Sequence, residues 1–293
     1  MRMANLAGRA HLVAGDRSVD VARASGGRFP ADPMAVLDRW AEVVAWSRDV
    51  DVAAGAPWDP AELGAPSPRP RQVFAVASNY RDRPLVLPTP ADLPVTFTKF
   101  PACVVGPYAD VPLPTDMVDW EVELVVVIGR AAHRVPAAAA WDVVAGVTAG
   151  QDFSERTLQL GGPAKQFSLG KSFPAFGPTG PVLVTPDELA DRDDLGLSCR
   201  VNGETLQDAR TRQLIFPVAE LVARLSGVCA LLPGDLIFTG TPGGMGMTMT
   251  PPRYLRVGDE VVSHIEGIGG LRNRCTAPDG VTEERRYGNG PLS

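Results

Sequence analysis

The chain has 293 residues, 45% of them hydrophobic, and a net charge of −6 from 28 basic and 34 acidic side chains. This composition excludes global disorder, and an acidic chain without a long basic run is a poor candidate for binding nucleic acid or anionic membranes. With 30 glycines, 28 prolines and only 6% aromatic residues, turns and short strands are expected to outnumber long helices.

The cysteines and the lengths of the apolar runs indicate in which cellular compartment the protein is expected. Cysteines stand at positions 103, 199, 229 and 275, with no CxxC pair and no zinc-type cluster with histidine. Free thiols in a reducing compartment are therefore expected. The longest apolar runs are of strand length, and the N-terminus lacks the apolar core of a signal peptide. We expect a cytoplasmic protein that acts on a small molecule.

Residues 1–70 are expected to form a small N-terminal domain that ends in a proline-rich connector. Alternating apolar residues over 10–22 predict a hairpin with its turn at Gly15-Asp16. A helix is predicted from Pro33 to about residue 46, because apolar side chains at 37, 40, 41 and 44 share one helical face. Five prolines between positions 57 and 70 exclude a central strand there.

Residues 71–278 are predicted to form a β-rich catalytic domain, and residues 279–293 a flexible polar tail. One clear helix follows Pro217, where apolar side chains at 218, 221, 222 and 225 repeat at helical spacing. Strand-like runs show no regular alternation with helices, which predicts an α+β fold. The expected strands cover residues 73–77, 95–99, 121–128, 143–148, 181–185, 197–201, 236–239 and 261–265.

A pair of glutamates is the first candidate for chemistry. Glu121 and Glu123 are two residues apart in a predicted strand, so their side chains point to the same face. Val125 and Val127 continue that face, which indicates that it is partly covered. Two neighbouring carboxylates on a covered face repel each other, and a divalent cation would relieve the repulsion. Two exposed glutamates on an edge strand are the alternative.

Three further features join this pair. Asp152 follows an apolar strand, where a helix N-cap is the simpler interpretation, and Lys171 is a candidate whose alternative is a solvated surface lysine. The glycine-rich run at 235–246 either brings backbone N–H groups to a ligand oxygen or is a plain turn. Three carboxylates without a nearby cysteine or histidine favour a hard cation, Mg²⁺ first, with Mn²⁺ or Ca²⁺ as alternatives.

The order of these motifs resembles the fumarylacetoacetate hydrolase family over residues 72–275. This resemblance implies a mixed β-sheet roll around a metal site, and a homodimer that uses Mg²⁺, Mn²⁺ or Ca²⁺. The matching pieces include VASNYRD at 76–82, PVTFTK at 94–99, DWEVELVVVIG at 119–129, AGVTAGQDFSERTLQ at 145–159, KSF at 171–173, NGETLQ at 202–207 and LPGDLIFTGTPGGMG at 232–246.

The resemblance also implies the roles of individual residues. The metal ligands would be Glu121, Glu123 and Asp152. Lys171, Arg156 and Gln159 would contact the substrate or brace the ligands, and Thr241 would contact substrate oxygens. We further expect Lys171 to be catalytic and Lys99 to bind substrate. Substrates of the family are 2-oxo acids and β-dicarbonyl acids, which react through a metal-stabilised enolate.

One departure from the family pattern concerns the first motif. Many hydrolase and decarboxylase members have NYxDHxxE, in which the His/Glu pair activates water, but here Arg83 and Val86 take those two positions. Arginine stays protonated and cannot act as a base, although it can bind a substrate carboxylate. Asp82 or Lys99 is then the alternative source of a base.

We expect a metal-dependent enzyme that cleaves a C–C bond of such an acid, as a hydrolase or decarboxylase. A tautomerase, isomerase or hydratase of the same substrates is the first alternative, favoured by the missing His/Glu pair, because these reactions need less water activation. A non-catalytic metal-binding homologue is the second. Three retained and mutually repelling carboxylates argue against it.

Overall fold

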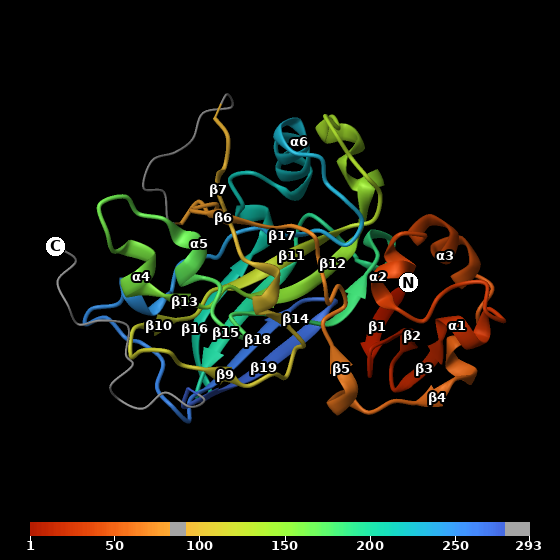
Figure 1. The fold of residues 1–293 in the computed structure, drawn as a ribbon, viewed down its shortest axis with the longest axis horizontal. Coiled ribbons are helices and arrows are strands. Elements are labelled where there is room, and N and C mark those ends of the chain that lie inside the picture. The colour runs from red at the N-terminus through yellow and green to blue at the C-terminus, as the bar shows by residue number, and fades with distance from the viewer. Residues whose placement is uncertain (83–91, 279–293) are drawn as a thin grey trace.

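The computed structural model describes residues 1–82 and 92–278, and its centre is a mixed sheet (Figure 1). Short strands β5 (Leu63–Gly64) and β8 (Val104–Val105) pair with β1 (Arg2–Leu6) and β14 (Gly177–Val184), respectively. The strands of the main path lie in the order β4 (Ala56–Pro57), β3 (Arg17–Asp20), β2 (Arg9–Ala14), β1 (Arg2–Leu6), β14 (Gly177–Val184), β12 (Val144–Gln151), β11 (Val122–Ile128), β17 (Leu236–Phe238), β6 (Val73–Ala77) and β7 (Val95–Thr98).

A second sheet packs across the first. Its strands lie near the bottom centre of Figure 1. Strand β11 contacts β15 (Gly196–Val201), and both β11 and β12 contact β18 (Glu260–Ile265). All seven residues of β11 are buried because this strand lies between β12 and β17 and beneath the second sheet. The second sheet has the order β16 (Glu204–Arg210), β15 (Gly196–Val201), β18 (Glu260–Ile265), β19 (Gly269–Thr276) and β9 (Val111–Pro112), and a separate pair joins β10 (Val118–Asp119) to β13 (Ser154–Glu155).

The helices are short and lie around the sheets. None of those described is long and apolar enough to cross a membrane. The α-helices are α1 (Val21–Ala24), α2 (Pro33–Leu37), α3 (Trp40–Ser47), α4 (Arg156–Leu160), α5 (Phe167–Gly170) and α6 (Val218–Val228). The 3₁₀ helices are η1 (Val52–Ala54), η2 (Pro60–Glu62), η3 (Pro101–Cys103), η4 (Ala137–Val143), η5 (Pro186–Glu188), η6 (Thr211–Gln213) and η7 (Gly246–Thr248).

The β-rich α+β fold is confirmed, as are all eight expected strands, with shifted ends. The hairpin is also confirmed, because the pairing of Ala14 with Arg17 leaves Gly15-Asp16 as its turn. The four cysteines are free, as expected. Three strands of the second sheet, β9, β16 and β19, were missed. In β19 the buried residues Leu271, Asn273 and Cys275 alternate with arginines, a period-2 pattern that a polar residue partly hides.

The prediction of a single helix from Pro33 is wrong in one respect, because the segment forms two helices, α2 and α3. Arg39 stands between α2 and α3 with φ −118° and ψ 26°, outside the helical region. Its guanidinium donates to the carbonyl of Arg28, pairs with Glu42 and lies 4.8 Å from the ring centre of Phe29. These tertiary contacts are visible only in the folded chain.

Residues 1–64 add their strands to the central sheet. Strand β1 pairs antiparallel with β14, so Met3 lies opposite Leu183, and the red and orange elements of Figure 1 continue the sheet at one end. The division of the chain near residue 70 stays a prediction. The expected tail, 279–293, lies outside the described residues.

Candidate metal centre

The three carboxylates of the candidate site come together where β11 begins and β12 ends. Glu121 directly precedes β11, Glu123 is its second residue, and Asp152 follows β12. The backbone N–H of Asp152 donates to the carbonyl of Glu121 at 2.9 Å, which brings the two strand ends together. One carboxylate oxygen of each residue lies within 4.8 Å of the others. These residues are 7%, 1% and 0% exposed, so the alternative of exposed edge glutamates is wrong.

Two buried cations hold this group of acids. Lys171 Nζ donates to Glu121 Oε2 at 2.7 Å and to Asp152 Oδ2 at 2.6 Å. Arg156 Nη2 donates to Glu121 Oε1 and to Asp119 Oδ2, both at 2.7 Å. Lys171 is only 2% exposed, so the surface-lysine alternative is also wrong. Each cation bridges two carboxylates, and Glu121 is therefore paired on both of its oxygens.

Lys99 binds the same cluster through the Asp152 oxygen that Lys171 does not contact. Its ammonium donates to Asp152 Oδ1 at 2.6 Å and to the backbone carbonyl of Lys171, and its side chain is fully buried. The ring of Phe238 lies 5.8 Å from the same nitrogen. Through these contacts Lys99 holds Asp152 and the backbone at Lys171. A role of Lys99 in substrate binding or as a base stays a prediction.

Helices α4 and α5 place Arg156 and Lys171. The N-cap of α4 is Glu155, whose carboxylate accepts from the N–H groups of Thr157 and Leu158, so the interpretation of Asp152 as a cap is wrong. Gln159 Oε1 accepts from Arg156 Nη1 at 2.7 Å and thereby braces the guanidinium. A Cβ on Gly170 would lie 2.8 Å from the carbonyl of Glu155. The missing side chain lets α5 approach α4 and carry the next residue, Lys171, into the cluster.

The two glutamates differ in electrostatic environment. Burial alone would raise the pKa of Glu121, but Lys171 and Arg156 outweigh it and lower that pKa to about 2. Burial and the charges of Asp152 and Glu121 raise the pKa of Glu123 well above its ordinary value. Within residues 1–82 and 92–278, no lysine or arginine forms an ion pair with Glu123. One of its oxygens accepts from the Gly240 N–H at 2.7 Å.

The glycine-rich loop after β17 is part of the site, so the plain-turn alternative is wrong. Gly240 has φ +102°, and a Cβ there would lie 2.8 Å from Asn79 Cβ, so glycine lets the N–H reach Glu123. Thr241 Oγ1 donates to the carbonyl of Val122 at 2.9 Å and accepts from Gln207 Nε2 at 2.8 Å. Contact between Thr241 and substrate stays a prediction.

Gln207 is a positioning residue that the sequence analysis missed. Its Oε1 accepts from the N–H of Val122 at 3.0 Å, while its Nε2 donates to Thr241 and to the carbonyl of Pro242. The residue belongs to β16 of the second sheet and ties that sheet to both the acid-bearing strand and the loop. Its presence in the NGETLQ motif was the available signal.

The first motif is described only in part. Asp82 is exposed, and its Oδ2 accepts from the N–H of Gly243 at 2.9 Å. Arg83 and Val86 lie outside the described residues, as does any pairing of Asp82 with Arg83. The catalytic roles expected for Asp82 and Arg83 therefore stay predictions.

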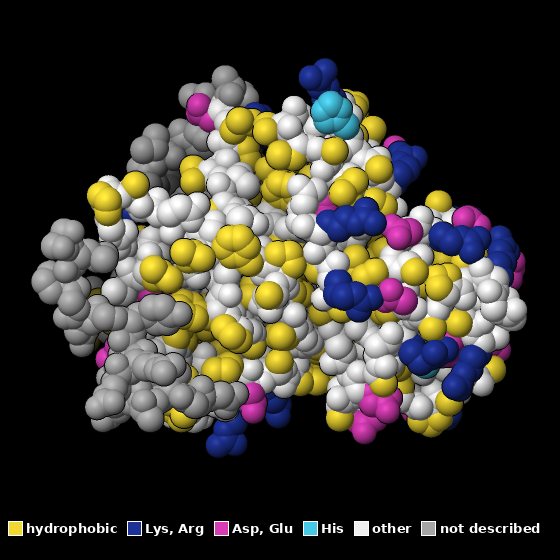
Figure 2. All heavy atoms as spheres, in the orientation of Figure 1, with side chains coloured by type: hydrophobic (Ala, Val, Ile, Leu, Met, Phe, Trp, Pro, Cys, Tyr) yellow, Lys and Arg dark blue, Asp and Glu magenta, His cyan; other side chains and the backbone are white. Residues whose placement is uncertain are grey.

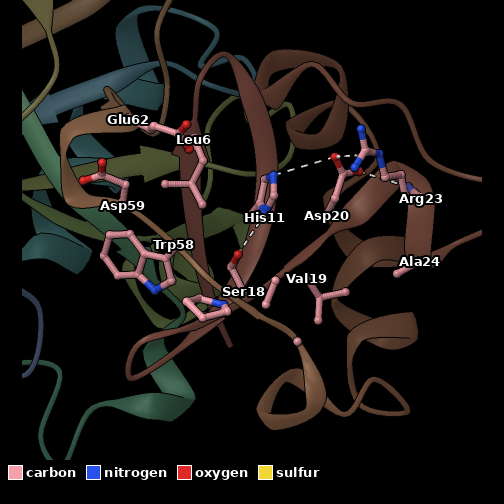
Figure 3. Close-up of a pocket in the computed structure, with 13 residues that line it drawn as sticks. Leu6, His11, Ser18, Val19, Asp20, Arg23, Ala24, Trp58, Asp59 and Glu62 are labelled. Atoms are coloured by element: carbon pink, nitrogen blue, oxygen red, sulfur yellow. Dashed lines mark hydrogen bonds and ion pairs between the residues drawn. The ribbon is translucent and has the colours of Figure 1, made fainter.

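A separate hollow of about 660 Å³ lies in the N-terminal part and contains a histidine, a serine and an aspartate (Figure 3). His11 Nδ1 lies 3.3 Å from Ser18 Oγ, but His11 Nε2 is 3.7 Å from Asp20 Oδ2. Asp20 instead accepts from Arg9 Nε at 2.6 Å and from the N–H of Arg23 at 2.9 Å. The carboxylate is thus engaged in an ion pair and a helix cap, and does not hydrogen-bond to the histidine as in a nucleophilic triad.

The donor set fits a hard divalent cation. All three candidate ligands offer carboxylate oxygens, which Mg²⁺, Mn²⁺ and Ca²⁺ prefer. The buried ion-pair network, with Glu123 added, contains four carboxylates and three cations: Asp119, Glu121, Glu123, Asp152, Lys99, Arg156 and Lys171. Its net charge is therefore −1 when all are ionised, and a divalent cation would change this to +1. Fold and site together define a β-rich protein with a buried carboxylate cluster that is a candidate metal centre.

Comparisons with known proteins agree with this class. The family model for the C-terminal part of fumarylacetoacetate hydrolase matches residues 72–276. The chain therefore belongs to the fumarylacetoacetate hydrolase family. It is 45% identical over 214 residues to oxaloacetate tautomerase FAHD2A, mitochondrial, of Bos taurus, covering 72% of this chain and 68% of that protein.

Two solved structures extend the similarity to the N-terminal part. A candidate HpcE protein from Mycobacterium smegmatis is 52% identical with a TM-score of 0.90, covering 94% of this chain and 100% of that one. The maleylpyruvate hydrolase of Sphingobium sp. SYK-6, solved with manganese(II) and pyruvate, is 26% identical with a TM-score of 0.79, covering 95% and 100%. A divalent metal is thus present in a protein of the same fold.

Metal removal is expected to lower the melting temperature. A cation that binds only the folded protein stabilises it by RT ln(1 + [L]/Kd), which is about 2.7 kcal/mol at a hundred times Kd. Differential scanning fluorimetry over a Mg²⁺ series, with an EDTA-treated sample as reference, should show a melting temperature that rises with the logarithm of concentration. An identical melting temperature in EDTA and in millimolar Mg²⁺ would contradict a specific site.

Proposed function

We propose that this chain is a Mg²⁺-dependent tautomerase that interconverts the keto and enol forms of oxaloacetate. The observation that carries the proposal is the 45% identity, over 72% of the chain, to a relative named oxaloacetate tautomerase. Cleavage of a C–C bond, our main expectation from the sequence, has weaker support than this alternative. The departure at Arg83 and Val86 points the same way, since tautomerisation moves a proton without attack by water.

The charge of the site supports an anionic substrate. With a divalent cation the buried network would carry a net charge of +1, and a 2-oxo acid or its enolate would supply the compensating negative charge. Burial strengthens this preference, because charges interact more strongly away from water. Oxaloacetate offers a 2-oxo group with one carboxylate next to it and a second carboxylate beyond the CH₂ group, which suit both the cation and the buried ammonium groups.

The side chains of this chain have distinct roles in the proposed reaction. A bound divalent cation would polarise the 2-oxo group and so acidify the neighbouring C–H bond. Arg156 holds Glu121, the Gly240 N–H holds Glu123, and Lys99 holds Asp152, so the three ligands are fixed before substrate arrives. Lys171 places an ammonium between Glu121 and Asp152, where it can hold a substrate oxygen.

Hydrolysis of a C–C bond is the second candidate function. It is favoured by the similarity to the maleylpyruvate hydrolase, which is 26% identical over nearly the whole chain. This reaction needs a base for water, and Asp82, which directly precedes segment 83–91, is a candidate for that base. The tautomerase remains the better supported of the two because its relative has the higher identity.

The proposal predicts faster keto–enol equilibration of oxaloacetate without loss of carbon. Fresh enol-rich oxaloacetate should lose its enol ultraviolet absorbance faster with enzyme and Mg²⁺ than with Mg²⁺ alone. A lactate dehydrogenase coupling run in parallel should detect no pyruvate beyond the uncatalysed background. Stoichiometric pyruvate would instead indicate a decarboxylase, and an unchanged rate would contradict the proposal. The Glu123→Gln variant is the matched control, because it keeps the shape of the site.

A homodimer is part of the proposal. Figure 2 shows a face on which apolar side chains are numerous. Strand β7 and helix α5 contact each other and carry the exposed residues Val95 and Leu169, which are 63% and 60% accessible. Such exposed apolar groups on neighbouring elements support association. The expected cytoplasmic location stays a prediction.

A further inference from the structure

The segment 79–82 is fixed beside the glycine-rich loop. Asn79 Nδ2 donates to the carbonyl of Thr239 at 2.8 Å, and Asp82 Oδ2 accepts from the N–H of Gly243 at 2.9 Å. The backbone carbonyl of Asn79 also accepts a hydrogen bond from the N–H of Ile215 at 2.7 Å. The same loop gives its Gly240 N–H to Glu123. Tyr80 lies between these anchors and is therefore held close to Glu123 of the acid cluster.

Tyr80 has a buried hydroxyl group without a partner. Tyr80 is 0% exposed, and its Oη forms no hydrogen bond with any described residue. Buried tyrosine hydroxyls are normally hydrogen-bonded, because an unpaired buried donor costs free energy. Burial, and then the negative charges of Glu123 and Asp82, raise the pKa of Tyr80. The phenol thus keeps its proton and offers a donor near the carboxylates.

We propose that the Tyr80 hydroxyl is a substrate-binding group that donates a hydrogen bond to an oxygen of a small 2-oxo acid at the metal centre. The inference rests on the substrate class of the proposed function. An anionic oxygen is the partner that a protonated phenol lacks, and the cluster attracts such oxygens once it holds a divalent cation. No side chain within 1–82 and 92–278 competes for this donor.

The test compares Tyr80→Phe with the wild type by two measurements. Calorimetry should give the Kd of Mg²⁺, and then the Kd of oxalate at saturating Mg²⁺, with oxalate as an unreactive mimic of the 2-oxo acid. Loss of a hydrogen bond to a charged oxygen should weaken oxalate binding about tenfold or more, with the Mg²⁺ Kd unchanged. The melting temperature without oxalate should stay the same or rise, because the variant removes an unsatisfied hydroxyl.

The control is Tyr108→Phe, which removes the hydroxyl of a tyrosine that is 44% exposed, and it should leave both constants unchanged. Equal oxalate affinity in Tyr80→Phe and wild type would overturn the inference, and so would a loss of Mg²⁺ affinity. Oxalate binding by wild type without tautomerase activity would refute the proposed reaction alone. No oxalate binding by wild type would overturn both the substrate class and the role of Tyr80.

Discussion

Replacing Glu123 by glutamine is expected to abolish measurable Mg²⁺ binding and, at the same time, to stabilise the metal-free protein. Glu123 is the member of the cluster with no lysine or arginine partner among the described residues, and the charges of Glu121 and Asp152 act against its ionised form. Glutamine keeps the size of the side chain and removes the charge. Titration calorimetry with Mg²⁺ and denaturant unfolding in EDTA measure the two effects.

The stabilisation by Glu123→Gln should depend on pH in a defined direction. A carboxyl whose pKa is raised in the folded state binds more protons folded than unfolded, so stability falls as pH rises above its unfolded value. That fall begins near the ordinary pKa of 4.5 and continues to the raised native pKa. The variant should therefore match wild type in acid and exceed it towards neutral pH.

A matched control separates the site from a general effect of charge. Glu62→Gln removes the charge of an exposed glutamate in η2 and should change neither Mg²⁺ binding nor the pH dependence. Mg²⁺ binding of wild-type strength in Glu123→Gln would refute the assignment of this residue as a ligand.

Replacing Lys171 by methionine is expected to have the opposite effect on stability. Its ammonium pairs with Glu121 and Asp152, and removal would leave both carboxylates buried with one partner fewer. Breaking a buried ion pair from one side costs about 3–5 kcal/mol. Denaturant unfolding in EDTA should show a loss of this size, and added Mg²⁺ should recover part of it, because the cation neutralises the same carboxylates.

The control for this variant is Lys165→Met, at an exposed position of the same segment. Its effect should stay within about 0.5 kcal/mol, as for surface substitutions in general. A loss below about 1 kcal/mol in Lys171→Met would show that the ammonium contributes little to holding the acids. In that case Arg156 and Lys99 would be sufficient to hold Glu121 and Asp152 in the metal-free protein.

Local patterns were sufficient for eight of the strands and for the pairing of Glu121 with Glu123. A period of two residues places Glu121 and Glu123 on one face whatever the rest of the chain does, and the apolar runs around them were long enough to predict β11 and β12. The hairpin at Gly15-Asp16 follows from turn chemistry in the same way. The ordered motifs added Asp152 and Lys171, and these residues do lie together in the fold.

Only the tertiary structure decided whether these acids are exposed or buried and what neutralises them. The partners of Glu121 and Asp152 come from positions 99, 156 and 171, and the N–H that holds Glu123 comes from position 240. Spacing along one strand carries no information about such distant segments, because their positions depend on how the sheets and helices pack. For the same reason the unpaired hydroxyl of Tyr80 and the bridging amide of Gln207 could not be found from the sequence, since a missing or a long-range hydrogen bond exists only in the folded chain.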